Sequence, residues 1–298
     1  MLAWFVTTAL AGSGPWSLSK GDLSVYGGIE AQRFTTLAPV FDGELVPVVV
    51  GGRIHNTTIK GAISLGLIDR VEIEVSVPIQ RVEAALTGGG ACADFPLSPC
   101  ETSQGLGLVD LRTKWQLIDE LGGAPISAAL GARVRLGAHT QATRERITNL
   151  GEGTTDFGIY GVIGRTAGLG QGFYNGFLEV GYLHRPPNLL EPRSPHDELW
   201  SDLVFHVAPR RIVCLGPASS LFWRPGGVDF DTVDLSRSDR FASLRALNLR
   251  VGGELVLRDP EVGVALSVTV LQTVVARNNP SDTWIVSLGL SAQSSLRR

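Results

Sequence analysis

Residues 56–82, NTTIKGAISLGLIDRVEIEVSVPIQRV, decide the fold of this chain. From Val71 to Gln80, the apolar residues Val71, Ile73, Val75, Val77 and Ile79 alternate with Glu72, Glu74, Ser76 and Gln80, and Pro78 is the one exception on the polar face. A period of two is the pattern that a β-strand imposes on its side chains. The first half of the stretch alternates in the same way, and residues 68–70 connect the two halves. The stretch therefore predicts a β-hairpin with one apolar face and one polar face.

The same alternation recurs along the rest of the chain. No apolar run reaches the roughly 20 residues that a membrane-spanning helix needs, so spanning helices are excluded. Together with the hairpin, the pattern predicts twelve strands, at residues 23–32, 56–67, 71–80, 109–117, 127–136, 156–164, 174–182, 198–207, 212–223, 247–257, 262–270 and 284–290. The ninth of these alternates poorly and contains Pro217, and a further short strand is expected at residues 46–50. The predicted fold class is all-β.

Two features favour a membrane-spanning barrel over a soluble β-sandwich. Long connections alternate with short ones, and each strand has about the 9–11 residues that a tilted strand needs to cross a bilayer. The weaker face of each strand also carries too many charges to line a dry core. A sandwich would tolerate the alternation, but it gives no reason for long loops at one end only. We therefore expect a single antiparallel up-and-down transmembrane β-barrel of about 12 strands in the bacterial outer membrane, with both termini on the periplasmic side.

The ends of the chain and its cysteines suggest export. Residues 1–11 are predicted to be a signal peptide in part, with an A-x-A pattern but no basic n-region, and residues 12–298 the outer-membrane barrel domain. The alternative for the first residues is a buried N-terminal strand. Cys92 and Cys100 lie close together in a segment rich in glycine and proline, so a disulfide between them is expected. Cys214 is left over and is interpreted as an apolar filler, and a zinc site is not expected.

Aromatic and charged side chains fit this picture. Trp115, Trp223, Trp284 and Tyr182 lie near strand ends, where an aromatic belt is expected. The charged side chains opposite the apolar faces are predicted to line the lumen. These are Lys60, Glu72, Glu74, Asp110, Arg112, Lys114, Arg133, Arg135, Glu179, Glu198, Asp202, His206, Arg250 and Glu254.

Two hypotheses account for these charges. In the first, a basic strip and an acidic strip face a narrow hydrated pathway and orient polar or zwitterionic solutes. In the second, the charges pair with each other across strands and plug the interior. A barrel of about 12 strands lies between small barrels filled by side chains and large ones with an open channel.

Composition and motifs argue against other functions. A net charge of −3 and a pI near 6.0 exclude nucleic acid as an expected partner. The five histidines form no motif with a nucleophile, so we predict no enzyme, no cofactor and no metal. His184 lies on the lipid-facing side near the outer rim, where a lipid hydrolase would act, but a single interfacial histidine is more often structural.

Several short motifs resemble one known family. They are Gly66–Arg70 at the first tight turn, Val77 with Pro78, Gly107–Leu111 followed by Lys114 and Trp115, and Gly153–Phe157. In these pieces the chain resembles the outer-membrane transporters associated with the meta-cleavage pathway of phenol degradation. The resemblance implies an outer-membrane channel or transporter for small molecules, with hydrophobic or aromatic compounds as candidate solutes. It transfers no functional residue.

The sequence thus predicts a porin-like outer-membrane channel or transporter for small molecules. The alternatives are a closed structural or surface-binding barrel without transport, and a membrane-embedded lipid enzyme. Expected partners are outer-membrane lipid, a small-molecule solute and the barrel-assembly machinery. The assembly machinery commonly reads a terminal aromatic residue, whereas this chain ends in Arg297 and Arg298.

Overall fold

The computed structural model describes residues 14–38, 40–41, 43–46, 48–86, 100–137, 153–186, 196–210, 212–227, 229, 245–259 and 261–295. Cys92 and the proposed signal peptide lie outside this part of the chain. Among the described residues, no helix has the length and hydropathy of a membrane-spanning one.

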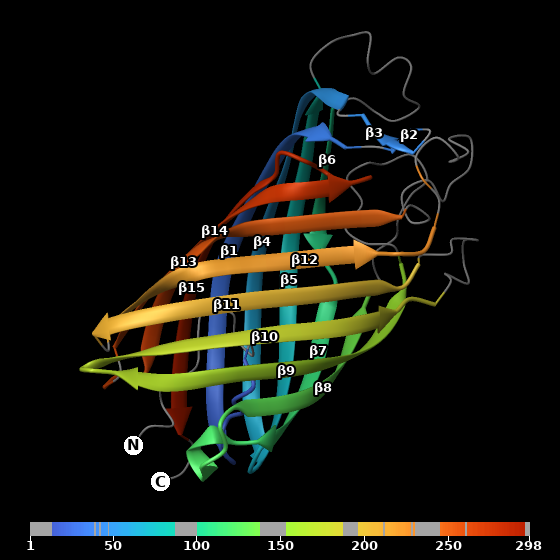
Figure 1. Ribbon diagram of the computed structural model, residues 1–298. Coiled ribbons are helices and arrows are strands. Elements are labelled where there is room, and N and C mark those ends of the chain that lie inside the picture. The colour runs from blue at the N-terminus through green and yellow to red at the C-terminus, as the bar shows by residue number, and fades with distance from the viewer. Residues whose placement is uncertain are drawn as a thin grey trace.

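The described chain forms a closed antiparallel β-barrel of 12 strands (Figure 1). Its wall strands are β1 (Asp22–Leu37), β4 (Val48–Ile68), β5 (Val71–Leu86), β6 (Cys100–Leu106), β7 (Val109–Ile118), β8 (Ser127–Leu136), β9 (Thr155–Leu169), β10 (Gly172–His184), β11 (Glu198–Arg210), β12 (Val213–Arg224), β13 (Ala246–Asp259), β14 (Val264–Arg277) and β15 (Trp284–Ser295). β6 and β7 count as one wall strand because both pair with β5 in succession. Pairing of β1 with both β4 and β15 closes the barrel.

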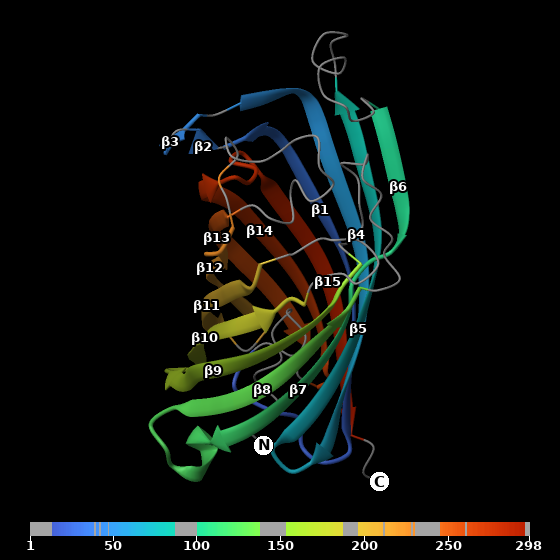
Figure 2. The ribbon, with the colours of Figure 1, turned by 90° about the vertical axis from the view of Figure 1, so that its right-hand side faces the viewer.

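All twelve predicted strands are confirmed, including the ninth with Pro217. The separate short strand expected at residues 46–50 is wrong, because Val48 already begins β4, which is 21 residues long. Two residue pairs before it, β2 (Val40–Phe41) and β3 (Glu44–Leu45), form a small hairpin instead. Figure 2 shows that β4, β5 and β6 rise beyond the end of β8.

The outer face of the barrel is apolar. Ile59, Leu130 and Ile163 are 50–56% exposed, and similar side chains surround the wall. Such a continuous apolar surface is unfavourable in water and favourable in hydrocarbon, where a closed barrel also satisfies all its backbone hydrogen bonds. The barrel is therefore a membrane-spanning one of the bacterial outer membrane.

The two ends of the barrel differ in their connections. Asp22 at the start of β1 lies opposite Ser295 at the end of β15, so β1 begins and β15 ends at the same rim. At that rim short turns join β4 to β5 and β9 to β10, whereas residues 87–99 and 225–245 connect strands at the opposite rim. Short turns mark the periplasmic rim of such barrels. The rim with the longer connections is therefore external.

Residues 14–19, the N-terminal segment, enter the barrel at the periplasmic rim. The Leu18 backbone N–H donates to Glu72 Oε2 at 2.9 Å, and Ser17 donates to Gln116 Oε1 through its N–H and its hydroxyl. The Trp16 indole N–H donates to Glu120 Oε1 at 3.0 Å. Sequence patterning did not predict this segment, because it has no periodicity.

Two apolar clusters lie on the inner face and were not predicted. The first contains Phe173, Ala208, Cys214, Val256 and Ala265. The second contains Tyr160, Val162, Phe177, Val204 and Ala218, against which Trp16, Trp200 and Leu271 pack. The interior is therefore partly apolar as well as charged.

Candidate functional site

The predicted lumen residues occupy inward-facing positions of their strands. Seven of them are nearly fully buried, with 0–6% exposure: Glu72, Glu74, Lys114, Glu179, Glu198, His206 and Glu254. The other seven are partly buried: Lys60, Asp110, Arg112, Arg133, Arg135, Asp202 and Arg250. Their apolar strand neighbours face outward and are exposed. That they line a solute path stays a prediction.

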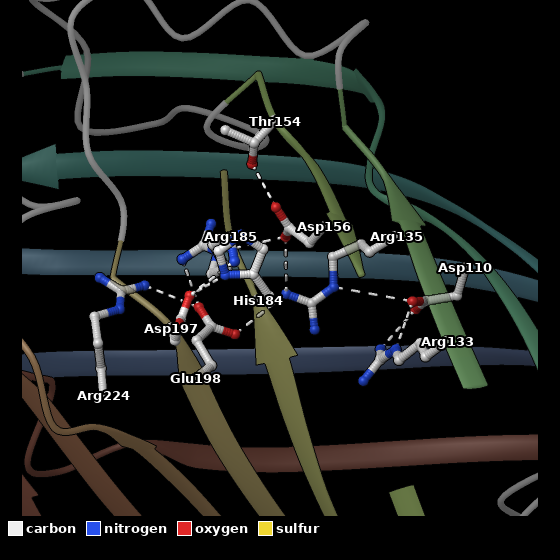
Figure 3. Close-up of polar contacts among 10 residues, drawn as sticks. All are labelled: Asp110, Arg133, Arg135, Thr154, Asp156, His184, Arg185, Asp197, Glu198 and Arg224. Carbon is white, nitrogen blue, oxygen red and sulfur yellow. Dashed lines mark hydrogen bonds and ion pairs between the residues drawn. The ribbon is translucent and has the colours of Figure 1, made fainter. Parts of the chain in front are cut away.

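Near the external rim, Glu198 of β11 binds guanidinium groups from three other parts of the wall (Figure 3). Its carboxylate accepts from Arg185 at 2.6 Å, from Arg224 at 2.9 Å and from Arg135 at 3.3 Å. Arg185 follows the end of β10 and Arg224 ends β12. Neither was predicted, because each lies at a strand end where the alternation stops.

The same arginines reach two aspartates. Asp156 lies 3.4 Å from Arg185 and 3.8 Å from Arg135, and it accepts from the Thr154 hydroxyl at 2.7 Å. Asp110 binds Arg133 through both carboxylate oxygens, at 2.7 and 2.8 Å. We call Asp110, Arg133, Arg135, Asp156, Arg185, Glu198 and Arg224 the external network (Figure 3).

Deeper in the barrel, Arg112 and Glu179 form a second centre. Arg112 Nη2 donates to both carboxylate oxygens of Glu179 at 2.7 Å, and the Trp200 indole N–H donates to the same carboxylate at 3.0 Å. The Arg112 guanidinium also lies 4.4 Å from the centre of the Tyr160 ring. Arg133 lies over the Trp200 ring in the same way, at 5.1 Å. Each arginine thus contacts both a carboxylate and an aromatic ring.

The predicted basic and acidic strips therefore pair with each other. Arg112 and Arg135 of β7 and β8 reach Glu179 and Glu198 of β10 and β11 across β9. These residues thus pair across strands, as the second hypothesis requires, whereas a plugged interior stays a prediction. The space bounded by Glu72, Glu74, Arg112, Lys114 and Tyr160 leaves no room for a water molecule.

A third group of inward-facing ionisable side chains lies on β11 and β13. His206 Nε2 lies 2.9 Å from Glu254 Oε2, and both side chains are 1% exposed. Asp202 of β11 and Arg250 of β13 lie on one rung, on either side of Ser220 of β12. Small polar side chains such as Ser267, Thr269 and Ser287 form much of this wall.

His184 is not isolated on the outer face. Its Nδ1 lies 3.0 Å from Asp197 Oδ1, and Asp197 also accepts from the Tyr182 hydroxyl and from the Arg185 N–H. Burial would raise the pKa of Asp197, but the hydrogen bonds from Tyr182 and Arg185 and the nearby His184 lower it. The third side chain in this group is the phenol of Tyr182, whereas a serine hydrolase would need a serine beside the histidine. The sequence missed Asp197 because it is 13 residues from His184 and belongs to no alternating pattern.

Comparison with known proteins identifies the fold. No protein-family model and no curated protein matches this chain. An outer membrane channel from Pseudomonas putida F1 superposes with a TM-score of 0.67 at 13% identity, over 93% of this chain and 97% of that one. The translocator domain of the autotransporter NalP from Neisseria meningitidis gives a TM-score of 0.43 at 9% identity, over 93% and 89%. The first likeness establishes the fold alone, that of an outer-membrane β-barrel, and the second is too weak to add to it.

Proposed function

We propose that this chain is an outer-membrane channel for small molecules, and that its preferred solutes carry an aromatic ring and an acidic group. The observation that supports this proposal is the pairing of Arg112 and Arg133 with both a carboxylate and an aromatic ring. A ring stacks on a guanidinium or on Tyr160 and Trp200, and a carboxylate binds arginine in two-pronged fashion. In a solute with both groups, the carboxylate can therefore replace the carboxylate partner of Arg112 or Arg133, and the ring can replace its aromatic partner.

The alternation of charged and apolar inner surfaces supports the same solute class. A purely apolar solute would have to displace the ion pairs of the external network, which is unfavourable. A purely ionic solute would meet the apolar cluster around Phe177 and Val204. An aromatic acid has a favourable partner on both surfaces. The resemblance to transporters of the meta-cleavage pathway, and the solved outer membrane channel of the same fold, agree with this proposal.

A closed structural barrel is the second candidate. The filled space beside Arg112 and the N-terminal segment inside the periplasmic rim favour it. The two candidates differ in conductance, since a closed barrel passes no ions.

Planar-bilayer recording and liposome swelling with the folded full-length protein test the proposal. We expect conductance steps, and faster entry of benzoate than of benzyl alcohol of similar size. The double variant Arg112→Gln/Glu179→Gln removes both charges together, so it leaves no unpaired buried charge. It should lower benzoate entry at least fivefold, whereas Arg210→Gln at a periplasmic turn should not.

Two results would contradict the proposal. Folded protein without conductance steps would favour the closed barrel. Equal entry of benzoate and benzyl alcohol would remove the preference for aromatic acids and leave an unselective channel.

A further inference from the structure

A group of basic side chains lies on the outer face of β1, β4 and β5, just above the apolar band. These strands run side by side toward the external rim (Figure 2). Ile29, Ile59 and Ile79 occupy one rung across the three strands and are 44–56% exposed. All three residues of this rung are isoleucines. Beyond it, toward the external rim, the rungs contain charged residues.

The next rungs carry arginine and histidine at outward-facing positions. Arg81 lies on the rung of Ala31 and Thr57, and Arg33 lies on the rung of His55 and Glu83. Arg53 lies two residues before His55, on the same face of β4. We call Arg33, Arg53, His55 and Arg81 the basic patch.

Among the described residues, one ion pair reaches the basic patch. Glu83 forms an ion pair with Arg81, and the two side chains are 40% and 57% exposed. Neither Arg33 nor Arg53 forms an ion pair with any residue in the described part of the chain. Arg33, Arg53 and Arg81 carry like charges on three successive strands, so they repel each other, and an anion bound among them would relieve this repulsion. The patch therefore favours an anionic ligand.

The position of the basic patch along the membrane normal indicates which anionic groups it can reach. Arg33 lies opposite Trp284 of β15, which is 51% exposed on the outer face. Tryptophan side chains of this kind mark the boundary between acyl chains and headgroups. Because the longer connections mark the external rim, the basic patch lies at the headgroups of the external leaflet.

We propose that the basic patch binds the phosphate groups of a phosphorylated lipid in the external leaflet. The guanidinium groups contact the phosphates, and the acyl chains pack along Ile29, Ile59 and Ile79 below them. A free anion would use only the upper half of this surface, whereas a lipid uses both halves. This inference does not rest on transport and holds equally for a closed barrel.

Native mass spectrometry of the full-length protein in detergent tests the inference, with lipid A as the phosphorylated probe. We expect the protein to retain lipid A and to lose it as ionic strength rises, because the contact is exposed and charged. The variant Arg33→Gln/Arg53→Gln/Arg81→Gln should bind lipid A at least tenfold more weakly. The control Arg165→Gln/Arg210→Gln, which removes arginines near the periplasmic rim, should bind as the unchanged protein does.

Each of the following results would overturn the inference. The first is that the triple variant retains lipid A as well as the unchanged protein does. The second is that the control variant loses as much lipid A binding as the triple variant. The third is that lipid A without its phosphates binds as well as intact lipid A. Displacement of lipid A by inorganic phosphate at matched concentration would likewise show an anion site without a lipid. Heat-modified gel mobility reports folding of each variant. If the triple variant does not fold, Arg33→Gln and Arg81→Gln alone should each weaken binding, and unchanged binding in both would contradict the proposal.

Discussion

At the scale of single residues, Glu198 neutralises guanidinium groups from three separate parts of the wall. Its side chain is 8% exposed, as is that of Arg224, and that of Arg185 is 4% exposed. Glu198→Gln would remove the carboxylate that Arg135, Arg185 and Arg224 share. Asp156 would remain beside Arg135 and Arg185. Breaking a buried ion pair by removing one partner costs roughly 3–5 kcal/mol.

We therefore expect Glu198→Gln to lower the free energy of unfolding by about 3 kcal/mol. Urea titration of tryptophan fluorescence in lipid vesicles measures the change. Glu261→Gln at an exposed periplasmic turn is the control and should change stability by less than about 0.5 kcal/mol. A similar small effect of Glu198→Gln would mean that water or the loops neutralise the arginines instead.

Asp229 is the residue at the external rim whose titration is most informative. The hydrogen bond from Arg277 is the main cause that lowers its pKa, and Asn278 and Arg245 act in the same direction against partial burial. A lowered pKa in the folded state stabilises the fold above the unfolded value of about 3.9. This stabilisation is lost as the pH falls from there through the folded pKa.

Carboxyl carbon chemical shifts from NMR would measure this titration. We expect Asp229 to titrate below about 3.9, and Arg277→Gln to move its pKa back toward that value. The stability difference between the unchanged protein and Asp229→Asn should shrink as the medium is acidified over the same range. If Asp229 titrates at or above its ordinary pKa, the hydrogen bond from Arg277 to Asp229 does not form in solution.

At the scale of strands, aromatic rings on one strand lie over glycines on the next. Trp200 of β11 covers Gly181 of β10, and Tyr160 of β9 covers Gly131 of β8. A Cβ atom added at Gly181 or Gly131 would overlap the ring. The glycine is thus required by its neighbour and not by its own backbone conformation.

Gly181→Ala should displace the Trp200 ring and weaken its hydrogen bond to Glu179. We expect a loss of about 1–3 kcal/mol in unfolding free energy, as for other overpacked sites. Gly61→Ala on the outer face of β4, where a Cβ atom would meet nothing within 4 Å, is the matched control. Equal stability of the two variants would show that the ring moves aside without cost.

At the scale of the whole molecule, the N-terminal segment packs against the inner apolar cluster and against polar side chains of the wall. Trp16 packs against the cluster, Pro15 is fully buried, and Leu18 is bound to Glu72. A variant without residues 14–19 would lose these contacts and open the space that they fill.

If the chain is a channel, deletion of residues 14–19 should raise its single-channel conductance severalfold. Lys20→Gln, at an exposed position beside the segment, should leave the conductance unchanged. Planar-bilayer recording compares the two variants. Equal conductance of the deletion variant and the unchanged protein would place the narrowest part of the pathway elsewhere, at the external network or beside Arg112.

The alternation of side chains by itself determined the strands, their inward and outward faces and the two-sided wall. This is because the period of two is a local property of the extended backbone, readable between neighbours such as Val71 and Glu72. It therefore also predicted the inward position of Arg112, Glu179 and Glu198. It did not predict which of them would meet.

Only the tertiary structure decided the partners. Arg112 meets Glu179, and Arg135 meets Glu198, because barrel closure and strand tilt bring side chains together across β9. Arg185, Arg224 and the N-terminal segment lie where no periodic pattern exists, so their inward course depends on contacts with residues far away in the chain. The sequence determined which face each side chain takes, since that is local, whereas pairing across the lumen is non-local and required the closed barrel.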